Sequence, residues 1–301
     1  MKKSFSLVMI NKHYAVARQC ASRLGVVLAT ALILSHYCAA QSIAQESFLG
    51  APGSDLGGQS GGAGWASPWA AASTNGVESQ TIAPGSLAFA AGGSPLATDG
   101  NHLSITSAQD SFDQFNRSLT ASRDNQTVYL SFLIRPTALP NTPGNPAYMG
   151  LLVSPGNTSR FFVGADASQP GFLVNNDGGG GEVSSSVAPT LNQTAFVVAR
   201  MDLRPGNDTI SLFINPTPGG TEPSTPDAVK NDLDLGSIST VGVTWGAGAA
   251  GSFDEIRFGN SFASVSPAAV VPEAGAFALM AATIPAMMFV VRRRLAASKN
   301  S

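Results

Sequence analysis

Hydrophobic and polar side chains alternate most clearly along residues 127–135, "TVYLSFLIR". Successive side chains of a β-strand point to opposite sides, so every second residue of this stretch would lie on one face. One face carries Val128, Leu130, Phe132 and Ile134, and the other carries Tyr129, Ser131, Leu133 and Arg135. The alternation predicts a β-strand that ends at Pro136, because proline cannot donate to a strand ladder.

Comparable patterns recur through the middle of the chain. The predicted strands are 86–90 (weak), 127–135, 148–153, 160–165, 171–176, 194–203, 209–216, 241–245 and 251–259. Turn-forming residues between them predict that 148–153 pairs with 160–165 and that 194–203 pairs with 209–216. The segments 46–76 and 217–228 read as loops, and 110–126 reads as a loop or a turn of helix.

No convincing amphipathic helix separates these strands. Many short strands with turn signals between them predict an all-β fold, an antiparallel β-sandwich in which one face of each sheet is buried. Charged residues make up only 12% of the chain, which also contains 32 Gly and 19 Pro. This composition suits an extracellular β-protein better than a helical cytosolic enzyme.

The segment order and its closing phrase, Phe253-Asp254-Glu255-Ile256-Arg257-Phe258, resemble those of the concanavalin A-like, laminin-G-like jelly roll. The glycine- and tryptophan-rich stretch 61–65 resembles the start of exported bacterial proteins of this type. The resemblance covers a domain at 46–267. It implies that the terminal strand returns next to the start of the domain, and it says little about a ligand.

Residues 1–45 have the layout of a secretory signal peptide with its signal helix. Five basic residues and no acid precede or flank an apolar run at 24–34, and small and polar residues follow. We expect cleavage near Ala40 or Gln45; the alternative is a short membrane anchor that stays attached. Both cysteines, Cys20 and Cys38, lie in this leader, so the exported chain would have no disulfide and no thiol nucleophile.

The C-terminal segment 268–301 has three parts. Pro272-Glu273 precedes 18 residues without a charge, 274–291, and Arg292, Arg293 and Arg294 follow. Eighteen helical residues span about 27 Å, close to the thickness of a thin hydrocarbon core, which predicts a single transmembrane helix. The arginines would stay in the cytoplasm by the positive-inside rule, so the sandwich would face outward.

This three-part tail resembles the PEP-CTERM sorting signal, with Ala274 where that family has a second proline. The resemblance implies a bacterial envelope protein with Pro272, Glu273, Arg292, Arg293 and Arg294 as its sorting signal. It also implies an exosortase-type enzyme as partner, in organisms that often make extracellular polysaccharide. The alternative is a permanent single-span membrane anchor.

Net charge separates several classes of partner. The whole chain carries 17 Lys+Arg and 19 Asp+Glu; without the five bases of the leader, 12 bases face 19 acids, a net charge of −7. Phosphate contacts need clustered Lys and Arg, and outside the tail the sequence has no such cluster. We therefore expect no nucleic-acid binding.

The residue types that catalysis needs are scarce. His102 is the only histidine after the leader, which argues against Ser-His-Asp catalysis and histidine-based metal sites. The closest carboxylate pair is Asp254-Glu255, and neighbouring strand residues point to opposite faces, so we expect no joint glycosidase action. We expect Asp254 in loop hydrogen bonds and Glu255 or Arg257 in a surface pair. The sequence thus predicts no catalytic residue and no enzyme.

Two kinds of ligand site stay open in the sequence. Laminin-G-like domains often bind calcium at a rim, and Asp166, Asn175, Asn176 and Asp177 could supply oxygen ligands there, although Asn and Asp also favour turns. Exposed aromatic rings could bind carbohydrate, and Trp65, Trp69, Tyr148 and Trp245 are the candidates; the alternative is that these rings pack in the core.

These patterns predict an exported, envelope-sorted, non-catalytic surface or matrix protein that binds or is embedded in extracellular polysaccharide. The alternatives are a secreted polysaccharide-active enzyme on the same fold and a permanently membrane-anchored binding domain.

Overall fold

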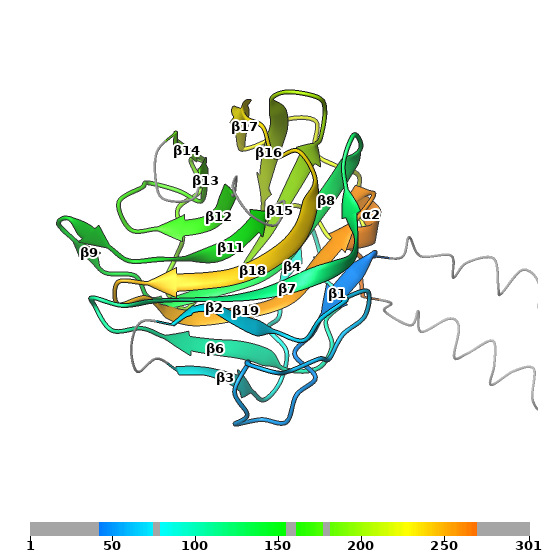
Figure 1. Cartoon of the computed structure of the whole chain (residues 1–301). Helices are drawn as coiled ribbons and strands as arrows, with labels where there is room; N and C mark the ends of the chain where they lie inside the picture. The colour runs from blue at the N-terminus through cyan, green and yellow to red at the C-terminus, as the bar shows by residue number, and fades with distance from the viewer. Residues whose placement is uncertain (1–41, 75–78, 155–160, 177–180, 270–301) are drawn as a thin grey trace, which may run out of the picture.

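The computed structural model describes residues 42–74, 79–154, 161–176 and 181–269 (Figure 1). They form two antiparallel sheets packed face to face. The larger sheet has the order β17 (Ala228–Leu233), β16 (Asp208–Ile214), β15 (Ala195–Asp202), β8 (Thr127–Ala138), β19 (Ala250–Gly259), β6 (His102–Thr106) and β3 (Ser79–Ala83), and β1 (Ala44–Glu46) also pairs with β19.

The second sheet has seven strands. Its order is β14 (Val183–Ser184), β13 (Leu173–Asn176), β12 (Phe161–Asp166), β11 (Tyr148–Ser154), β18 (Ile238–Gly246), β7 (Phe112–Arg123) and β2 (Ala70–Thr74). Two small hairpins, β4 (Ala90–Ala91) with β5 (Ser94–Pro95) and β9 (Asn141–Thr142) with β10 (Asn145–Pro146), and the short helix α2 (Phe262–Val265) complete the described part of the chain. The predicted all-β antiparallel sandwich is confirmed.

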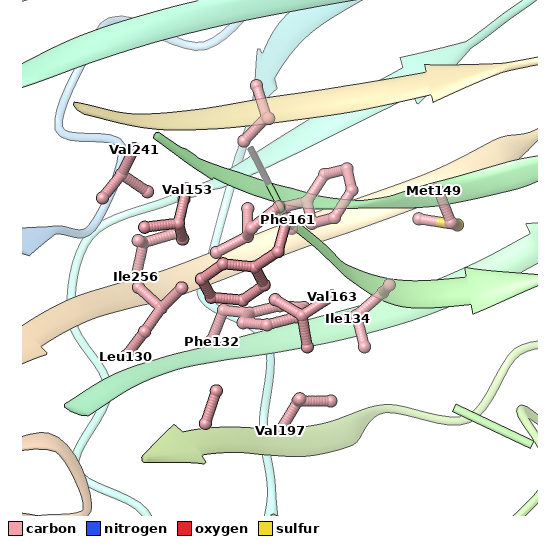
Figure 2. Packing of buried hydrophobic residues seen from close by; sticks show 14 of the residues in the cluster. Leu130, Phe132, Ile134, Met149, Val153, Phe161, Val163, Val197, Val241 and Ile256 are labelled. Carbon is pink, nitrogen blue, oxygen red and sulfur yellow. The ribbon is translucent and has the colours of Figure 1, made fainter. Parts of the chain in front are cut away.

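The main core lies between the two sheets. Val128, Leu130, Phe132 and Ile134 all point into it from β8, as the alternation predicts. Figure 2 shows the side chains of Phe161 and Val163 close to those of Phe132 and Ile134, which come from the other sheet. Each fully buried side chain of this size stabilises the fold by about 1.5–3 kcal/mol, so this core can hold the domain together without disulfides.

Several predictions for strands are wrong. The weak strand expected at 86–90 is absent, since residues 86–89 form no strand, and the segment 46–76 is not loop throughout, because β2 lies within it. Residues 110–126 are not a loop or a helical turn, because residues 112–123 form the long strand β7. Pro136 does not end β8, which continues to Ala138 with Pro136 opposite Gly251. The proline is tolerated there because β15 pairs with β8 only as far as Ile134, so no neighbour on that side needs its missing N–H.

The expectation of one buried face per sheet is also wrong for the eight-stranded sheet. Residues 84–101, which connect β3 to β6 and which we call the flap, cover its outer face together with α2. A second apolar cluster fills the space beneath them: Leu87, Leu96, Tyr129, Leu133, Phe196, Val198, Phe213, Phe262 and Val265, with Phe89 at its margin. The sandwich therefore has a third layer on this side.

The terminal strand returns to the start of the domain, as the family resemblance implies. Ala44 lies opposite Phe258 and Glu46 opposite Ile256. Gly64 has a φ of +79°, and a Cβ atom there would lie 1.9 Å from the Ile43 carbonyl oxygen, so glycine lets the chain pass close to β1. The boundary expected after residue 45 thus falls inside β1.

The ends of the described chain lie close together. β1 pairs with the last part of β19, α2 follows β19 directly, and both lie on the right of Figure 1. No described helix is long and apolar enough to cross a bilayer. The predicted signal helix, the predicted transmembrane helix 274–291 and the sorting-signal residues Pro272, Glu273 and Arg292–Arg294 lie outside the described residues.

Candidate functional site

Trp65 and Trp69 belong to a structural clasp around Arg117. The Arg117 guanidinium lies 5.2 Å and 5.9 Å from the two ring centres and pairs with Glu46, while the Trp69 Nε1 donates to Glu46 at 3.0 Å. Burial lowers the pKa of Arg117, against the effect of Glu46. Trp69 is 1% exposed, so it offers no face to a ligand, whereas Trp65 is partly exposed.

Trp245 lies in the main core. It is fully buried and stacks on Phe115, with ring centres 6.1 Å apart and planes 3° from parallel. Its side chain points to the interior because residues of even and odd number alternate along β18, and Val241 and Val243 share its face. Trp69 and Trp245 are therefore core residues, the alternative that the sequence left open for them.

Tyr148 lies on a different surface, the outer face of the seven-stranded sheet. The strand register places the side chains of this face in four rows across neighbouring strands. The rows are Phe112, Gly246, Tyr148 and Asp166; then Ser73, Gln114, Thr244, Gly150, Gly164, Leu173 and Ser184; then Ala70, Asn116, Gly242, Leu152, Phe162 and Asn175; and last Ser118, Thr240 and Ser154.

Four glycines on this face leave room for neighbouring side chains to lie flat against the sheet. A Cβ atom at Gly150 or Gly164 would lie 2.7–2.8 Å from the ring of Phe162, so the ring lies over both glycines. The Asn116 amide oxygen lies over Gly242 and the Tyr148 hydroxyl over Gly246 in the same way. Larger residues at these four positions would push the rings and amides outward, so the sequence builds a flat surface.

This face combines uncharged polar side chains with a small apolar cluster, in which Leu152, Phe162 and Leu173 are buried and Tyr148 packs against them. Gln114 Nε2 donates to Asn116 Oδ1 at 2.8 Å, and Thr244 Oγ1 donates to the Asp113 carbonyl at 3.1 Å. Phe112 is 41% exposed, and Tyr148 and Asn116 are partly exposed. Within the four rows Asp166 is the one charged residue. Sequence reasoning found Tyr148 and missed Phe112, Gln114 and Asn116, which lie in the misread segment 110–126.

The three calcium candidates that the structure describes, Asp166, Asn175 and Asn176, do not come together. Asp166 Oδ1 accepts from the backbone N–H and the hydroxyl of Ser168, at 2.7 and 2.6 Å, which is the turn chemistry that the sequence left as the alternative. Asn175 and Asn176 face opposite sides of the sheet, opposite Phe162 and Phe161, and Asp177 lies outside the described residues. In the part of the chain that the structure describes, no three His, Cys, Asp or Glu side chains are arranged to hold a metal ion.

The Asp254-Glu255 pair departs from strand alternation. Glu255 has a φ of +51°, and the pairing of β19 with β8 shifts between Asp254 and Arg257, which marks a β-bulge. Ser86 Oγ consequently lies within reach of both carboxylates, 2.6 Å from Asp254 Oδ2 and 3.5 Å from Glu255 Oε1. The expectation that the two acids point to opposite faces is wrong, because the bulge adds a residue to the strand.

The two acids and Arg257 are buried, so the expected surface pair is wrong as well. Asp254 and Glu255 are 0% exposed and Arg257 is 2% exposed. Arg257 Nη2 donates to Glu255 Oε2 at 2.5 Å. Burial raises the pKa of Asp254 to about 7, against the hydrogen bond from Ser86, and burial also raises the pKa of Glu255, against the Arg257 charge. These carboxylates hold the flap and do not face solvent.

His102 stands at the end of the flap. Its Nδ1 lies 2.6 Å from the Gly85 carbonyl oxygen, so it donates there and closes the flap's base. This hydrogen bond gives His102 a capping role at the flap.

Comparison with protein-family models finds no match, and comparison with curated proteins finds none either. Among solved structures the chain is similar to an endo-1,3-beta-glucanase from Streptomyces sioyaensis, at 11% identity over 73% of this chain and 96% of that chain, with a TM-score of 0.43. It is also similar to a glycosyl hydrolase family 16 protein from Mycobacterium smegmatis, at 13% identity over 72% and 100% of the two chains, with a TM-score of 0.42.

A third similar structure is lectin II from Ulex europaeus, at 10% identity over 62% of this chain and 99% of that chain, with a TM-score of 0.35. The strand pairing described above, and not these distant similarities, defines the fold.

Proposed function

We propose that this chain is an exported, envelope-sorted, non-catalytic surface or matrix protein whose sandwich binds neutral extracellular polysaccharide. The outer face of the seven-stranded sheet is the binding surface. Export is supported by the pattern of residues 1–45, and sorting by Pro272-Glu273, the apolar run 274–291 and the three arginines. The partners are an exosortase-type enzyme, the membrane through the tail, and the polysaccharide.

The observation that carries this proposal is the chemistry of the outer face. Sugars present hydroxyl groups to amides and flat C–H faces to aromatic rings, and the partly or fully exposed side chains of Asn116, Tyr148 and Phe112 offer both kinds of contact. Its four rows contain no Lys or Arg, so an acidic polysaccharide would find no counter-charge and would meet Asp166. A neutral chain fits this surface better.

Binding by the full chain, purified in mild detergent, tests the proposal. We expect retention on neutral polysaccharides and weak or no retention on acidic ones such as alginate. Replacing Phe112 and Tyr148 by Ala should weaken binding at least tenfold, because aromatic anchors carry much of the energy at such surfaces. Leu191→Ala is the matched control, since Leu191 is 49% exposed but lies outside the four rows. Equal binding by both variants would contradict the proposal.

A secreted polysaccharide-active enzyme is the rival function, and the paired carboxylates Asp254 and Glu255 are the observation in its favour. Both side chains are fully buried beneath the flap, so a sugar chain cannot reach them while the flap is seated. Release of reducing sugar by the purified chain, abolished by Glu255→Gln, would favour the enzyme.

Mass spectrometry of the native protein tests processing at both ends. A C-terminus near residue 272 supports sorting, and an intact Ser301 supports a permanent anchor. At the other end we expect cleavage near Ala40 and not at Gln45, because β1 begins at Ala44 and Glu46 is buried against Arg117. A mature chain that starts at Glu46 would contradict this part of the proposal.

A further inference from the structure

The flap is attached to β19 by hydrogen bonds to two acidic side chains. The Leu87 N–H and the Ser86 hydroxyl donate to Asp254 Oδ2 at 2.7 and 2.6 Å, and the Asp99 N–H donates to Glu255 Oε1 at 2.5 Å. Arg257 adds a hydrogen bond from Nη2 to the Ala97 carbonyl. The attachment therefore depends on the charges of three neighbouring buried groups.

Those charges do not balance. Asp254 and Glu255 would carry two negative charges against the one positive charge of Arg257, and the Arg257 Nη2 already donates to Glu255 and to the flap. A buried net charge is costly, since the protein interior solvates it far less well than water does. A single proton bound by the two carboxylates would make the cluster neutral.

The surrounding elements offer little to change this count. On the flap, Asp99 adds a further negative charge next to Glu255. On β8, Arg135 carries a positive charge and lies two residues beyond Leu133, the cross-strand partner of Asp254. On β6, His102 holds the base of the flap. Helix α2 carries no charged residue.

The flap also holds the C-terminal end of the described chain. The Ala97 N–H donates to the Pro267 carbonyl at 2.9 Å, and the Ala269 N–H donates to the Pro95 carbonyl at 2.8 Å. Leu96 forms a bridge with Ala268 between these two bonds. The segment 266–269 is thus fastened to the flap, and the flap is fastened to the acids of β19.

We propose that the flap is a pH-dependent latch, seated firmly while the Asp254–Glu255–Arg257 cluster holds an extra proton and loosened, together with residues 266–269, once that proton is lost. The apolar contacts of Leu87, Leu96 and Phe89 keep the flap close to the sheet in both states. Loss of the proton therefore weakens the attachment and does not unfold the domain.

The sign follows from proton linkage. Burial raises the pKa of Asp254 to about 7, whereas an open flap exposes the carboxyl to water and returns its pKa to the ordinary range near 4. Opening then releases a proton. The seated state is favoured most below about pH 4, loses its advantage as the pH rises to about 7, and changes little above that.

Hydrogen exchange of the full chain in mild detergent, followed by mass spectrometry between pH 4.5 and 8, tests the latch. After correction for the intrinsic pH dependence of exchange, we expect opening of peptides from 84–101 and 266–269 to increase by up to about tenfold for each pH unit between about 4.5 and 7. Peptides from β8 serve as the internal reference and should not follow this trend.

Variants separate the titrating group from the hydrogen bonds. Asp254→Asn, which cannot titrate, should remove most of the pH dependence. Ser86→Ala should increase opening at every pH and keep the pH dependence, because it removes a donor without changing a charge. His102→Gln at the flap base and Asp232→Asn, an exposed carboxylate paired with Lys230 elsewhere, are controls and should leave the trend unchanged.

Flap exchange that is independent of pH in the native chain would overturn the proposal, as would a pH trend that survives Asp254→Asn or disappears in His102→Gln. The native chain alone provides the first of these results, so a variant that fails to fold does not remove the test.

Discussion

The outer faces of the two sheets differ in what covers them and in the charge that they carry. The face of the eight-stranded sheet is covered by the flap and α2, and it buries two carboxylates and a guanidinium beneath them. The face of the seven-stranded sheet is nearly free of charge, and four glycines let its rings and amides lie flat. The first face therefore contributes to stability through a third layer, and the second presents a surface that a partner could contact.

The largest expected effect lies on the covered face. Arg257→Ala should lower the free energy of unfolding by about 3–5 kcal/mol, because it leaves two buried acids without a cation. The same change at Arg200, an ion-paired residue on the same face whose side chain is 36% exposed, should cost at most about 1 kcal/mol. Urea unfolding measures both. Similar losses in the two variants would mean that the buried cluster has no special role.

On the flat face, Gly164→Ala should cost about 1–3 kcal/mol by overpacking. A Cβ atom there would lie 2.3 Å from the Met149 carbonyl oxygen and 2.6 Å from the Gly150 Cα, and neither backbone atom can move freely. Gly57→Ala is the control, since its nearest neighbour would be the Phe115 ring at 3.4 Å. A neutral Gly164→Ala variant in chemical unfolding would show that the flat face is not tightly packed.

Whole-domain stability should depend on pH through the covered face. The pKa of Asp254 is raised to about 7 in the folded chain, so the folded state binds its proton more tightly than the unfolded state, and stability falls as the pH rises from about 4 to 7. Between pH 5.5 and 7.5 the loss should be about 2 kcal/mol. Asp232, whose pKa is lowered by Lys230, acts in the opposite direction but is exposed. Unfolding curves that coincide at the two pH values would exclude this contribution.

The smallest effect on stability should come from Phe112→Ala. Its exposed ring contributes little to the fold, so the free energy of unfolding should change by less than about 0.5 kcal/mol, while affinity for neutral polysaccharide falls several-fold. Calorimetry of binding and urea unfolding on the same sample separate the two effects. A stability loss without a change in affinity would assign the ring to packing.

Local alternation was enough to predict the strands whose partners are apolar. In β8 and β16 every second residue enters the core, and the predicted pairing of 194–203 with 209–216 is confirmed. Local alternation failed to predict β7, because the interior face of this strand carries the charged residue Arg117. That guanidinium can be buried only because Glu46, 71 residues away along the chain, pairs with it. No local pattern reports such a partner.

The same limit applies to the site residues. The segment 253–258 predicted the returning terminal strand, but alternation assigned its acids to opposite faces. The bulge at Glu255 interrupts that alternation, and the flap residue Asp99 that donates to Glu255 lies 156 residues earlier in the chain. The flat face was found only through Tyr148. Its other members become visible when strands from distant parts of the sequence are placed in register.

The fastening of residues 266–269 has a mechanical consequence. Any traction that enters the domain from the C-terminal side acts first on the two hydrogen bonds that join Pro267 and Ala269 to the flap, and reaches β19 only afterwards. Those bonds can yield while β19 stays paired on both sides. We therefore expect the domain to give way locally under load, with its sheets intact.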